Sequence, residues 1–399
     1  MDVVTGLSIK YILLDRQNWW RFSKKFSNNI RFAIMKNIAK ILACCNKVLG
    51  FHKYTCSKCG YEVIVPHSCK SRFCSICGKK ATDNWIAQNM LILPKTTWQH
   101  ITFTMPSQIW NLFWMNRNLF NVLPAIAANV IKKVVKKKKV TLGMFAALHT
   151  FGRDLKRNVH IHLSVTTSGL SQDNSKWITG IYFHHQAVKN IWKFFIISLL
   201  RKQYNLSKLK LPKNLNHIKN YITFNSWLNM LYKKKWVVNL ARTSDNHKYN
   251  VEYLGKYLKR PPIGENRIKK YDGKSVSFEF LDHYTNEKKM MTLSVEEFIA
   301  RIISHIPDKH FKCIRYYGFL ANRVRSKLLP IVYKFVNMVV DQGRKIYITW
   351  RDLINSSFGY DPLTCPNCHI ELQLTEFVPP AKNIDLIAMH EQIACAGVN

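Results

Sequence analysis

Two Cys-x-x-Cys pairs constrain the fold of this chain more than any other feature. Cys56-Ser-Lys-Cys59 and Cys74-Ser-Ile-Cys77 are separated by fourteen residues. Each pair offers two thiolates on one tight turn, and each is followed directly by a glycine, as a sharp backbone reversal requires. The spacing is typical of a tetrahedral zinc site with four cysteine ligands. We therefore expect these four residues to hold a structural zinc ion with no open position for catalysis.

The segment between the two pairs contains further ligand candidates and is basic. Cys69 and His67 could each replace one of the four cysteines. Lys58, Lys70 and Arg72 lie within a few residues of the cysteines. Because cations on a rigid module position a protein on the phosphate backbone, we expect the zinc module to present a DNA-binding surface.

The charge balance of the whole chain also points to nucleic acid. The 399 residues include 61 Lys and Arg against 23 Asp and Glu, which gives a formal net charge of +38. Such a chain repels itself unless a polyanion neutralises it, and nucleic acid is the polyanion that fits best. The alternative is a lysine-rich composition inherited from an AT-rich genome. That bias explains the many lysines but not the scarcity of acidic residues.

Neither a secretion signal nor a membrane span is expected. Residues 1–25 lack the apolar segment of a signal peptide, and the longest apolar run, residues 194–200, is too short to cross a bilayer. We expect a cytoplasmic protein with no membrane partner, nucleoid-associated if the source is a bacterium. In a reducing compartment the eleven cysteines are better explained as metal ligands and buried thiols than as disulfides.

The periodicity of apolar residues predicts a mixture of helices and strands. Helices are expected at 28–49, 79–93, 107–139, 185–204, 217–232, 248–259 and 295–304, and strands at 98–105, 143–151, 158–167, 236–241 and 276–281. We expect three parts: an N-terminal helical and zinc-binding domain (1–95), a central domain (96–330) and a C-terminal tail (331–399). The tail contains Cys365-Pro-Asn-Cys368, for which half of a second zinc site and a pair of buried thiols are equal alternatives.

A pair of histidines is the first candidate for catalytic chemistry. Because side chains alternate along a strand, His160 and His162 would share one face while the apolar residues between and around them occupy the other. An isolated pair of this kind is more often solvated or packed in a core. Here His149 lies on the preceding expected strand, and a hairpin would bring it across from the pair. Two or three imidazoles could bind a divalent ion, with His100 as a second candidate for the third place.

A pair of tyrosines is the second candidate. Tyr253 and Tyr257 fall at positions i and i+4 of the helix expected at 248–259, so they would share one face. Such pairs are also common in ordinary helix packing. Lys256 lies between the two, and Lys259 and Arg260 follow, so cations suited to phosphate surround the phenols.

A free phenol is a poor nucleophile at neutral pH because its pKa is about 10. Adjacent cations and a metal-polarised phosphate would lower the barrier to its attack. Tyr249, one turn earlier, is a rival for the same role.

Taken together, these motifs resemble the two-tyrosine HUH single-strand endonucleases and, more narrowly, the rolling-circle transposases of the insertion-sequence-91 type. The segment from Ser68 to Cys77 is similar to the family's zinc-binding segment, although Ser75 stands where a proline is often found. Further similarities lie in His100-Ile-Thr-Phe-Thr-Met-Pro106, Leu148-His-Thr-Phe-Gly152, Asn158-Val-His-Ile-His162 and Tyr253-Leu-Gly-Lys-Tyr257 followed by Arg260-Pro-Pro. The resemblance runs from about residue 28 to about residue 325.

The resemblance implies an α+β fold in which an N-terminal helix and a four-cysteine zinc module precede an antiparallel sheet flanked by helices. It implies that one tyrosine attacks a phosphodiester of single-stranded DNA, leaving a 5′-phosphotyrosine and a free 3′-OH. The second tyrosine permits a paired cleavage, and the 3′-OH then rejoins the strands without ATP. His160, His162 and His149 would hold Mg²⁺ or Mn²⁺, and hairpin ends of the mobile element would be the DNA partners.

Two other functions explain part of the sequence. A non-catalytic, zinc-dependent DNA-binding protein accounts for the charge and the cysteines but gives the histidine and tyrosine pairs no role. A plasmid HUH replication initiator or relaxase shares the chemistry, and only the zinc segment and the motifs quoted above favour transposition. An inactive copy of a transposase would carry the same motifs.

Overall fold

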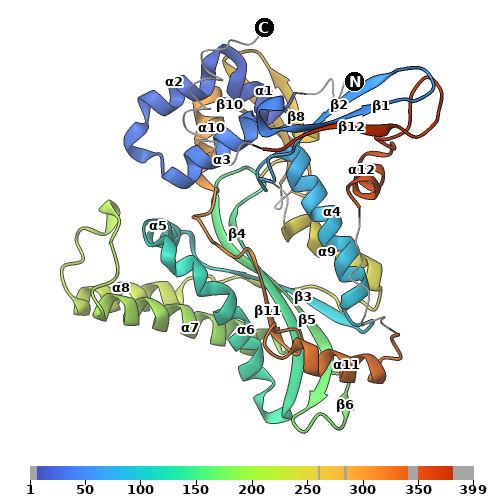
Figure 1. Cartoon of the computed structure of the whole chain (residues 1–399). Coiled ribbons are helices and arrows are strands. Elements are labelled where there is room, and N and C mark those ends of the chain that lie inside the picture. The colour runs from blue at the N-terminus through green and yellow to red at the C-terminus, as the bar shows by residue number, and fades with distance from the viewer. Residues whose placement is uncertain (1–6, 259–260, 283–284, 340–348, 381–399) are drawn as a thin grey trace.

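A computed structural model describes residues 7–258, 261–282, 285–339 and 349–380 of the chain (Figure 1). The helices are α1 Ile9–Leu14, α2 Asn18–Lys25, α3 Phe32–Leu42, α4 Ser75–Ile92, α5 Trp110–Met115, α6 Leu123–Val134, α7 His185–Asn205, α8 Tyr221–Lys233, α9 His247–Leu258, α10 Val295–Ser304, α11 Arg325–Phe335 and α12 Trp350–Phe358. The strands are β1 Phe51–Thr55, β2 Glu62–Pro66, β3 Trp98–Thr104, β4 Val140–Phe151, β5 Arg157–Ser171, β6 Trp177–Ile178, β7 Val238–Leu240, β8 Ile268–Tyr271, β9 Ser275–Leu281, β10 Lys288–Ser294, β11 Ile314–Gly318 and β12 Gln373–Val378. The expected α+β class is confirmed.

The centre of the molecule is a six-stranded antiparallel sheet in the order β11-β4-β5-β3-β7, with β6 on the end of β5. β4 and β5 are long and form the hairpin that the sequence predicts. Most of their residues are buried, because helices cover the sheet on both sides (Figure 1). Burial on both sides requires that any polar side chains on the strands be hydrogen-bonded.

The first face of the sheet is largely apolar. Ile101 of β3, Met144 of β4 and Ile161 of β5 point to this face and belong to one large core. Helices α5, α6, α7 and α8 supply the other half of that core, for example through Trp192 of α7 and Phe224 of α8. This layer contains the largest hydrophobic cluster of the described residues and fixes the register of the strands.

The second face of the sheet is mixed. Phe145 and Ala147 of β4 point to it and pack against Trp85 of α4, Val251 of α9 and Leu329 of α11. These three helices therefore cover the face opposite to α5–α8. All four histidines that the sequence singled out lie on this second face, because they alternate with residues of the first.

Segments that are distant in sequence share a second core. The N-terminal helices α1–α3 pack against α10 and the small sheet β8-β9-β10, through contacts among Ile12, Ile38, Phe278, Phe298 and Ile302. α10 needs such a partner because its apolar residues recur along one side of the helix. The three expected sequential domains therefore do not correspond to three separate hydrophobic cores.

The C-terminal segment also crosses back to the N-terminal part. β12 pairs with β1 along its length and completes a three-stranded sheet in the order β12-β1-β2 (Figure 1). α12 packs beside α4, where Ser357 Oγ donates a hydrogen bond to an Asp83 carboxylate oxygen at 2.6 Å. Among the residues that the structure describes, no helix is both long enough and apolar enough to cross a membrane.

His305 connects the second core to the central sheet. It caps the C-terminal end of α10, its Nε2–H donates to the Leu155 carbonyl at 3.0 Å, and Nδ1 accepts from the Thr150 hydroxyl at 3.2 Å. Burial, opposed by the Leu155 hydrogen bond and assisted by nearby arginines, lowers the pKa of His305 to about 4. Between these two pKa values, 6.5 in the unfolded chain and about 4 in the folded protein, the ring is neutral when the protein is folded and protonated when it is unfolded.

This depressed pKa predicts that the protein loses stability as the pH falls. The unfolded His305 titrates near its ordinary pKa of 6.5 and the folded one near 4, so between these values the unfolded state binds more protons. This group alone should reduce the free energy of unfolding by about 2 kcal/mol between pH 7.5 and pH 5. His305→Gln keeps a neutral donor and acceptor, so its melting temperature should fall less over that interval in thermal unfolding. An unchanged pH dependence in the variant would contradict this role of His305.

Candidate metal centres and nucleophile helix

The structure does not bring together the four cysteines that the sequence grouped. Cys56 and Cys59 lie on the turn between β1 and β2, whereas Cys74 and Cys77 lie at the start of α4. β2 carries the chain away from the first pair over about 17 Å, since a strand rises about 3.3 Å per residue. The expected single site of Cys56, Cys59, Cys74 and Cys77 is therefore wrong, and each pair meets a different set of partners.

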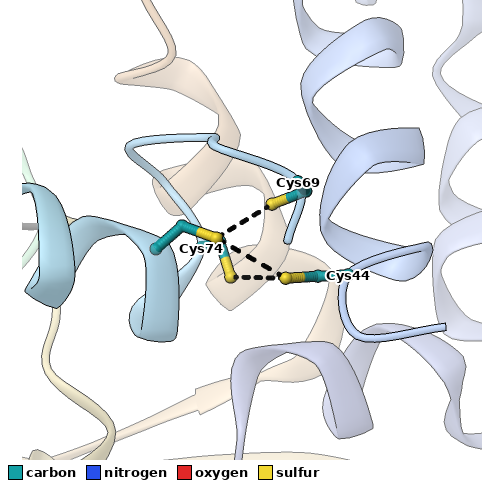
Figure 2. Close-up of side chains that lie close together, drawn as sticks. Cys44, Cys69 and Cys74 are labelled. Atoms are coloured by element: carbon teal, nitrogen blue, oxygen red, sulfur yellow. Dashed lines mark hydrogen bonds between the residues drawn. The ribbon is translucent and has the colours of Figure 1, made fainter. Parts of the chain in front are cut away.

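The inner cysteine cluster consists of Cys44, Cys69, Cys74 and Cys77, and its thiols converge at the start of α4. Figure 2 shows the side chains of Cys44, Cys69 and Cys74 directed toward one another. The Sγ of Cys44 lies 3.5 Å from that of Cys74 and 3.6 Å from that of Cys77, and Cys69 Sγ lies 3.6 Å from Cys77 Sγ. Four sulfurs about 2.3 Å from a central zinc ion are about 3.8 Å apart. The donor type, the number of donors and their spacing thus fit tetrahedral zinc.

Cys44 was missed in the sequence because it belongs to no Cys-x-x-Cys pair. It follows the end of α3, and its only local signal is the adjacent Cys45, which is exposed. The further candidate Cys69 does belong to the cluster. The other one, His67, lies elsewhere, with Nε2 3.1 Å from His52 Nδ1. Hydrogen bonds from Cys44, Cys69 and Cys74 lower the pKa of Cys77, so one thiolate is readily available to a metal.

A second set of thiols, the bridging cysteine cluster, consists of Cys56, Cys59, Cys365 and Cys368. The first pair of the sequence is therefore completed by the pair in the C-terminal tail. Cys59 Sγ lies 3.7 Å from Cys365 Sγ, a spacing close to that in the inner cysteine cluster. Cys395 and His390, which follow this pair in the sequence, lie outside the described residues.

Three histidines form a separate cluster on the second face of the central sheet. His149 of β4 is the direct cross-strand neighbour of His160 of β5, as the expected hairpin predicts, and His162 lies two residues further along β5. One ring nitrogen from each lies within 4.8 Å of the others, and all three side chains are buried. The His160 and His162 Nε2 atoms are 3.0 Å apart, about the separation of adjacent ligands 2.1 Å from an octahedral ion.

The other nitrogens of these rings are occupied by groups that fix the ring orientation. His160 Nδ1–H donates to the Asn158 carbonyl at 2.9 Å, which directs Nε2 toward the cluster. His162 Nδ1 lies 3.0 Å from His100 Nε2, and His100 Nδ1 lies 3.2 Å from Ser164 Oγ. His100 thus lies behind His162 rather than in the three-histidine group. Partners of this kind set the tautomer and raise the basicity of a ligating imidazole.

Burial keeps the imidazoles of His162 and His100 neutral. It is the main reason that the pKa of His162 lies well below its ordinary value, and the charges on His149, His160 and His100 would lower it further. Burial also lowers the pKa of His100 to about 4, with a smaller contribution from His160. A neutral imidazole offers a lone pair at physiological pH, which is the state that binds a metal.

The expected tyrosine-bearing helix is present as α9, and it covers the histidine face. It runs antiparallel to α4: His247 at its start lies 2.9 Å from the Met90 carbonyl near the end of α4, and Pro261 just beyond it packs on Gly78 near the start. Val251 is buried, and a Cβ on Gly255 would lie 2.3 Å from Ile86 Cγ1. Val251 and Gly255 therefore mark the side of α9 that faces α4.

By helical periodicity, positions 253 and 257 share a side of α9 roughly opposite to Gly255. The side chains of Tyr253, Lys256 and Tyr257 lie outside the described residues, as do Lys259 and Arg260 altogether. The rival Tyr249 is described and is 55% exposed.

The three basic residues near the cysteines that are expected to contact DNA lie in different surroundings. Lys58 is exposed on the bridging cysteine cluster, and Lys70 is exposed beside the inner one. Arg72 is half-buried, donates to Cys313 Sγ and lies over the Phe73 ring, so part of its side chain is engaged within the protein. The basic residues expected on one zinc module are thus spread over both cysteine clusters.

The inner cysteine cluster predicts that two adjacent cysteines differ sharply in importance. Cys44→Ser should reduce the zinc content by about one ion per chain and lower Tm by at least ~5 °C, because a structural zinc site contributes directly to folding. Cys45→Ser, one residue along and exposed, should change neither quantity. Elemental analysis and thermal unfolding measure both. Equal zinc content and Tm in the two variants would contradict Cys44 as a ligand.

Comparisons with known proteins agree with this arrangement. A family described as a putative transposase matches residues 143–327, and one described as a transposase zinc-binding domain matches residues 15–105. The transposase for insertion sequence element IS801 of Pseudomonas savastanoi pv. phaseolicola is 34% identical over 377 residues, covering 93% of this chain and 90% of that protein. The putative transposase y4qJ of Sinorhizobium fredii is 29% identical over 339 residues, covering 82% and 84%. No solved structure matches the chain.

The two families span the inner cysteine cluster, the histidine cluster and α9, and the first relative covers almost the whole chain. The chain therefore belongs to the insertion-sequence-91 family of transposases and carries the zinc-binding domain of that family.

Proposed function

We propose that this transposase cleaves and rejoins single-stranded DNA through 5′-phosphotyrosine intermediates, in rolling-circle transposition. One observation carries the proposal. The three-histidine cluster lies on the same face of the central sheet that α9, the helix with the tyrosine pair, covers. A metal-competent group and a candidate nucleophile on one face are what phosphodiester cleavage by a tyrosine requires.

In the proposed site, His149, His160 and His162 hold the divalent ion, Mg²⁺ or Mn²⁺. When bound, such an ion supplies Lewis-acid polarisation of a scissile phosphate oxygen. Burial holds His162 neutral, and Asn158 and His100 orient the His160 and His162 rings, so that these two ligands are preorganised. Three ligands from one sheet leave other positions for phosphate oxygens and water.

Tyr253 or Tyr257 is the proposed nucleophile. Its phenolate oxygen forms a bond to phosphorus while the bond from phosphorus to the 3′ oxygen breaks, so the departing strand keeps a 3′ oxygen that takes up a proton. Lys256, Lys259 and Arg260 supply positive charge next to the phenols and the phosphate. The second tyrosine permits a second cleavage, and reversal by a 3′-OH rejoins the strands with no net loss of phosphodiester bonds.

The proposed partners are single-stranded DNA and the hairpin ends of a mobile element in the bacterial nucleoid. The net charge of +38 supports strong, salt-sensitive binding to such a polyanion. Lys58, Lys70 and Arg72 are the proposed contacts near the cysteine clusters. Membership of a transposase family favours transposition over a replication initiator or relaxase with the same chemistry, and over a non-catalytic zinc protein.

The proposal predicts that the covalent DNA adduct depends on the tyrosine pair. Replacing Tyr253 and Tyr257 together by Phe should abolish the adduct, because no phenolic oxygen remains, and should leave DNA affinity within about two-fold. The measurement is incubation with a single-stranded DNA library and Mn²⁺, followed by denaturing electrophoresis and peptide mass spectrometry.

Tyr249→Phe is the matched control, since it removes an exposed phenol one turn earlier on the same helix. It should retain the adduct. An adduct that survives the double substitution and disappears with Tyr249→Phe would move the nucleophile to Tyr249.

The histidine cluster predicts metal-dependent cleavage. Replacing His160 and His162 by Ala should lower the metal-dependent cleavage rate at least ~100-fold, because two of three ligands are lost. His217→Ala, at an exposed position on the far side of the first core, should cleave at the normal rate. Single-turnover cleavage over a Mn²⁺ titration measures both. Rates that are unchanged in the double variant would exclude this group as the metal site.

A further inference from the structure

The bridging cysteine cluster lies outside the site of the proposed chemistry. It joins two segments 306 residues apart, through Cys59 and Cys365. Four sulfurs converge there with one ligand atom from each residue within 4.8 Å of the others. The Cys59–Cys365 spacing of 3.7 Å is close to the ~3.8 Å expected between sulfurs of a tetrahedral zinc site.

The two halves of the cluster have the same backbone structure. In the first, the Cys56 N–H donates to the Tyr61 carbonyl at 2.8 Å, and the Gly60 N–H donates to Cys56 at 3.0 Å. In the second, Cys365 donates to Ile370 at 2.8 Å, and His369 donates to Cys365 at 2.9 Å.

The fifth residue of each turn is left-handed, with φ of 72° at Gly60 and 57° at His369. A left-handed histidine is disfavoured without a compensating interaction. Two turns of this kind that meet at one end of a three-stranded sheet have the arrangement of a zinc ribbon.

Hydrophobic packing alone is a weak explanation for this association. The buried members of the local cluster are Cys56, Val63, Cys365 and Leu372, so half of them are the thiols themselves. β12 is exposed along nearly its whole length. A sheet with so little apolar burial gains little stability from the hydrophobic effect, which is the situation in which a structural metal supplies the folding energy.

We infer that Cys56, Cys59, Cys365 and Cys368 form a second structural zinc site, separate from the inner cysteine cluster, that joins the C-terminal segment to the N-terminal domain. This zinc holds β12 on β1 and positions α12 along α4. There Ser357 donates to Asp83 at 2.6 Å, and the Lys79 ammonium lies 5.0 Å from the centroid of the Phe358 ring. The inference does not depend on the proposed DNA chemistry.

Zinc counting on full-length variants tests this inference. The wild-type protein should bind about two zinc ions per chain, and Cys56→Ser/Cys59→Ser and Cys365→Ser/Cys368→Ser should each bind about one. The decisive variant combines all four substitutions and should still bind one, because both pairs serve one site. Adding Cys74→Ser/Cys77→Ser should remove the last ion. Cys313→Ser, outside both clusters, is the control and should bind two.

Two zinc ions retained in the Cys365→Ser/Cys368→Ser protein, or none left in the four-fold variant, would overturn the inference. A second measurement uses the wild-type chain and does not depend on how the variants fold. After zinc is chelated, mild oxidation with diamide should join a Cys56/Cys59 peptide to a Cys365/Cys368 peptide by a disulfide, detected by mass spectrometry after digestion. The zinc-loaded protein should resist this linkage. Absence of the linked peptide in the chelated protein would also overturn the inference.

Discussion

The close packing of α9 on α4 is the contact on which the arrangement of the proposed active site depends. Gly255 makes it possible, because any side chain at that position would collide with Ile86. α4 begins at the inner cysteine cluster and packs through Trp85 on the histidine face of the sheet. One helix therefore connects the zinc-binding domain, the metal-competent histidines and the helix that carries the tyrosines. Zinc in the inner cysteine cluster would stabilise this geometry without taking part in the chemistry.

The second face of the central sheet buries several polar side chains. It is covered by helices yet carries histidines, Ser164 and Thr166. Burying such groups is unfavourable unless each finds a partner, and here they find one another: His100 meets both His162 and Ser164, and the Thr166 hydroxyl accepts from the Gly143 N–H. The same burial holds the His162 and His100 rings neutral. Burial of the histidines is therefore unfavourable for stability, but it also leaves neutral imidazole nitrogens that can bind a cation.

The features that the sequence predicted are those encoded locally. The alternation of β4 and β5 placed His149 opposite His160, and the periodicity of residues 248–259 located α9 to within a residue at each end. The cysteine grouping failed because spacing along the chain does not reveal a partner 306 residues away, and because Cys44 belongs to no pair. The role of Gly255 and the contact of His100 with His162 depend on tertiary packing that no local pattern carries.

Because β12 pairs with β1, the N-terminal sheet cannot be completed until the end of the chain has been synthesised. A ribosome adds about 5–20 residues per second, so roughly 15–60 s separate the synthesis of Cys59 from that of Cys365. During that interval β1 has no partner strand on one side, and Cys56 and Cys59 lack the two cysteines that complete their cluster. The N-terminal sheet is thus among the first segments to emerge and among the last to be completed. A chain interrupted before its final strand would leave the ribosome with that edge exposed to other molecules.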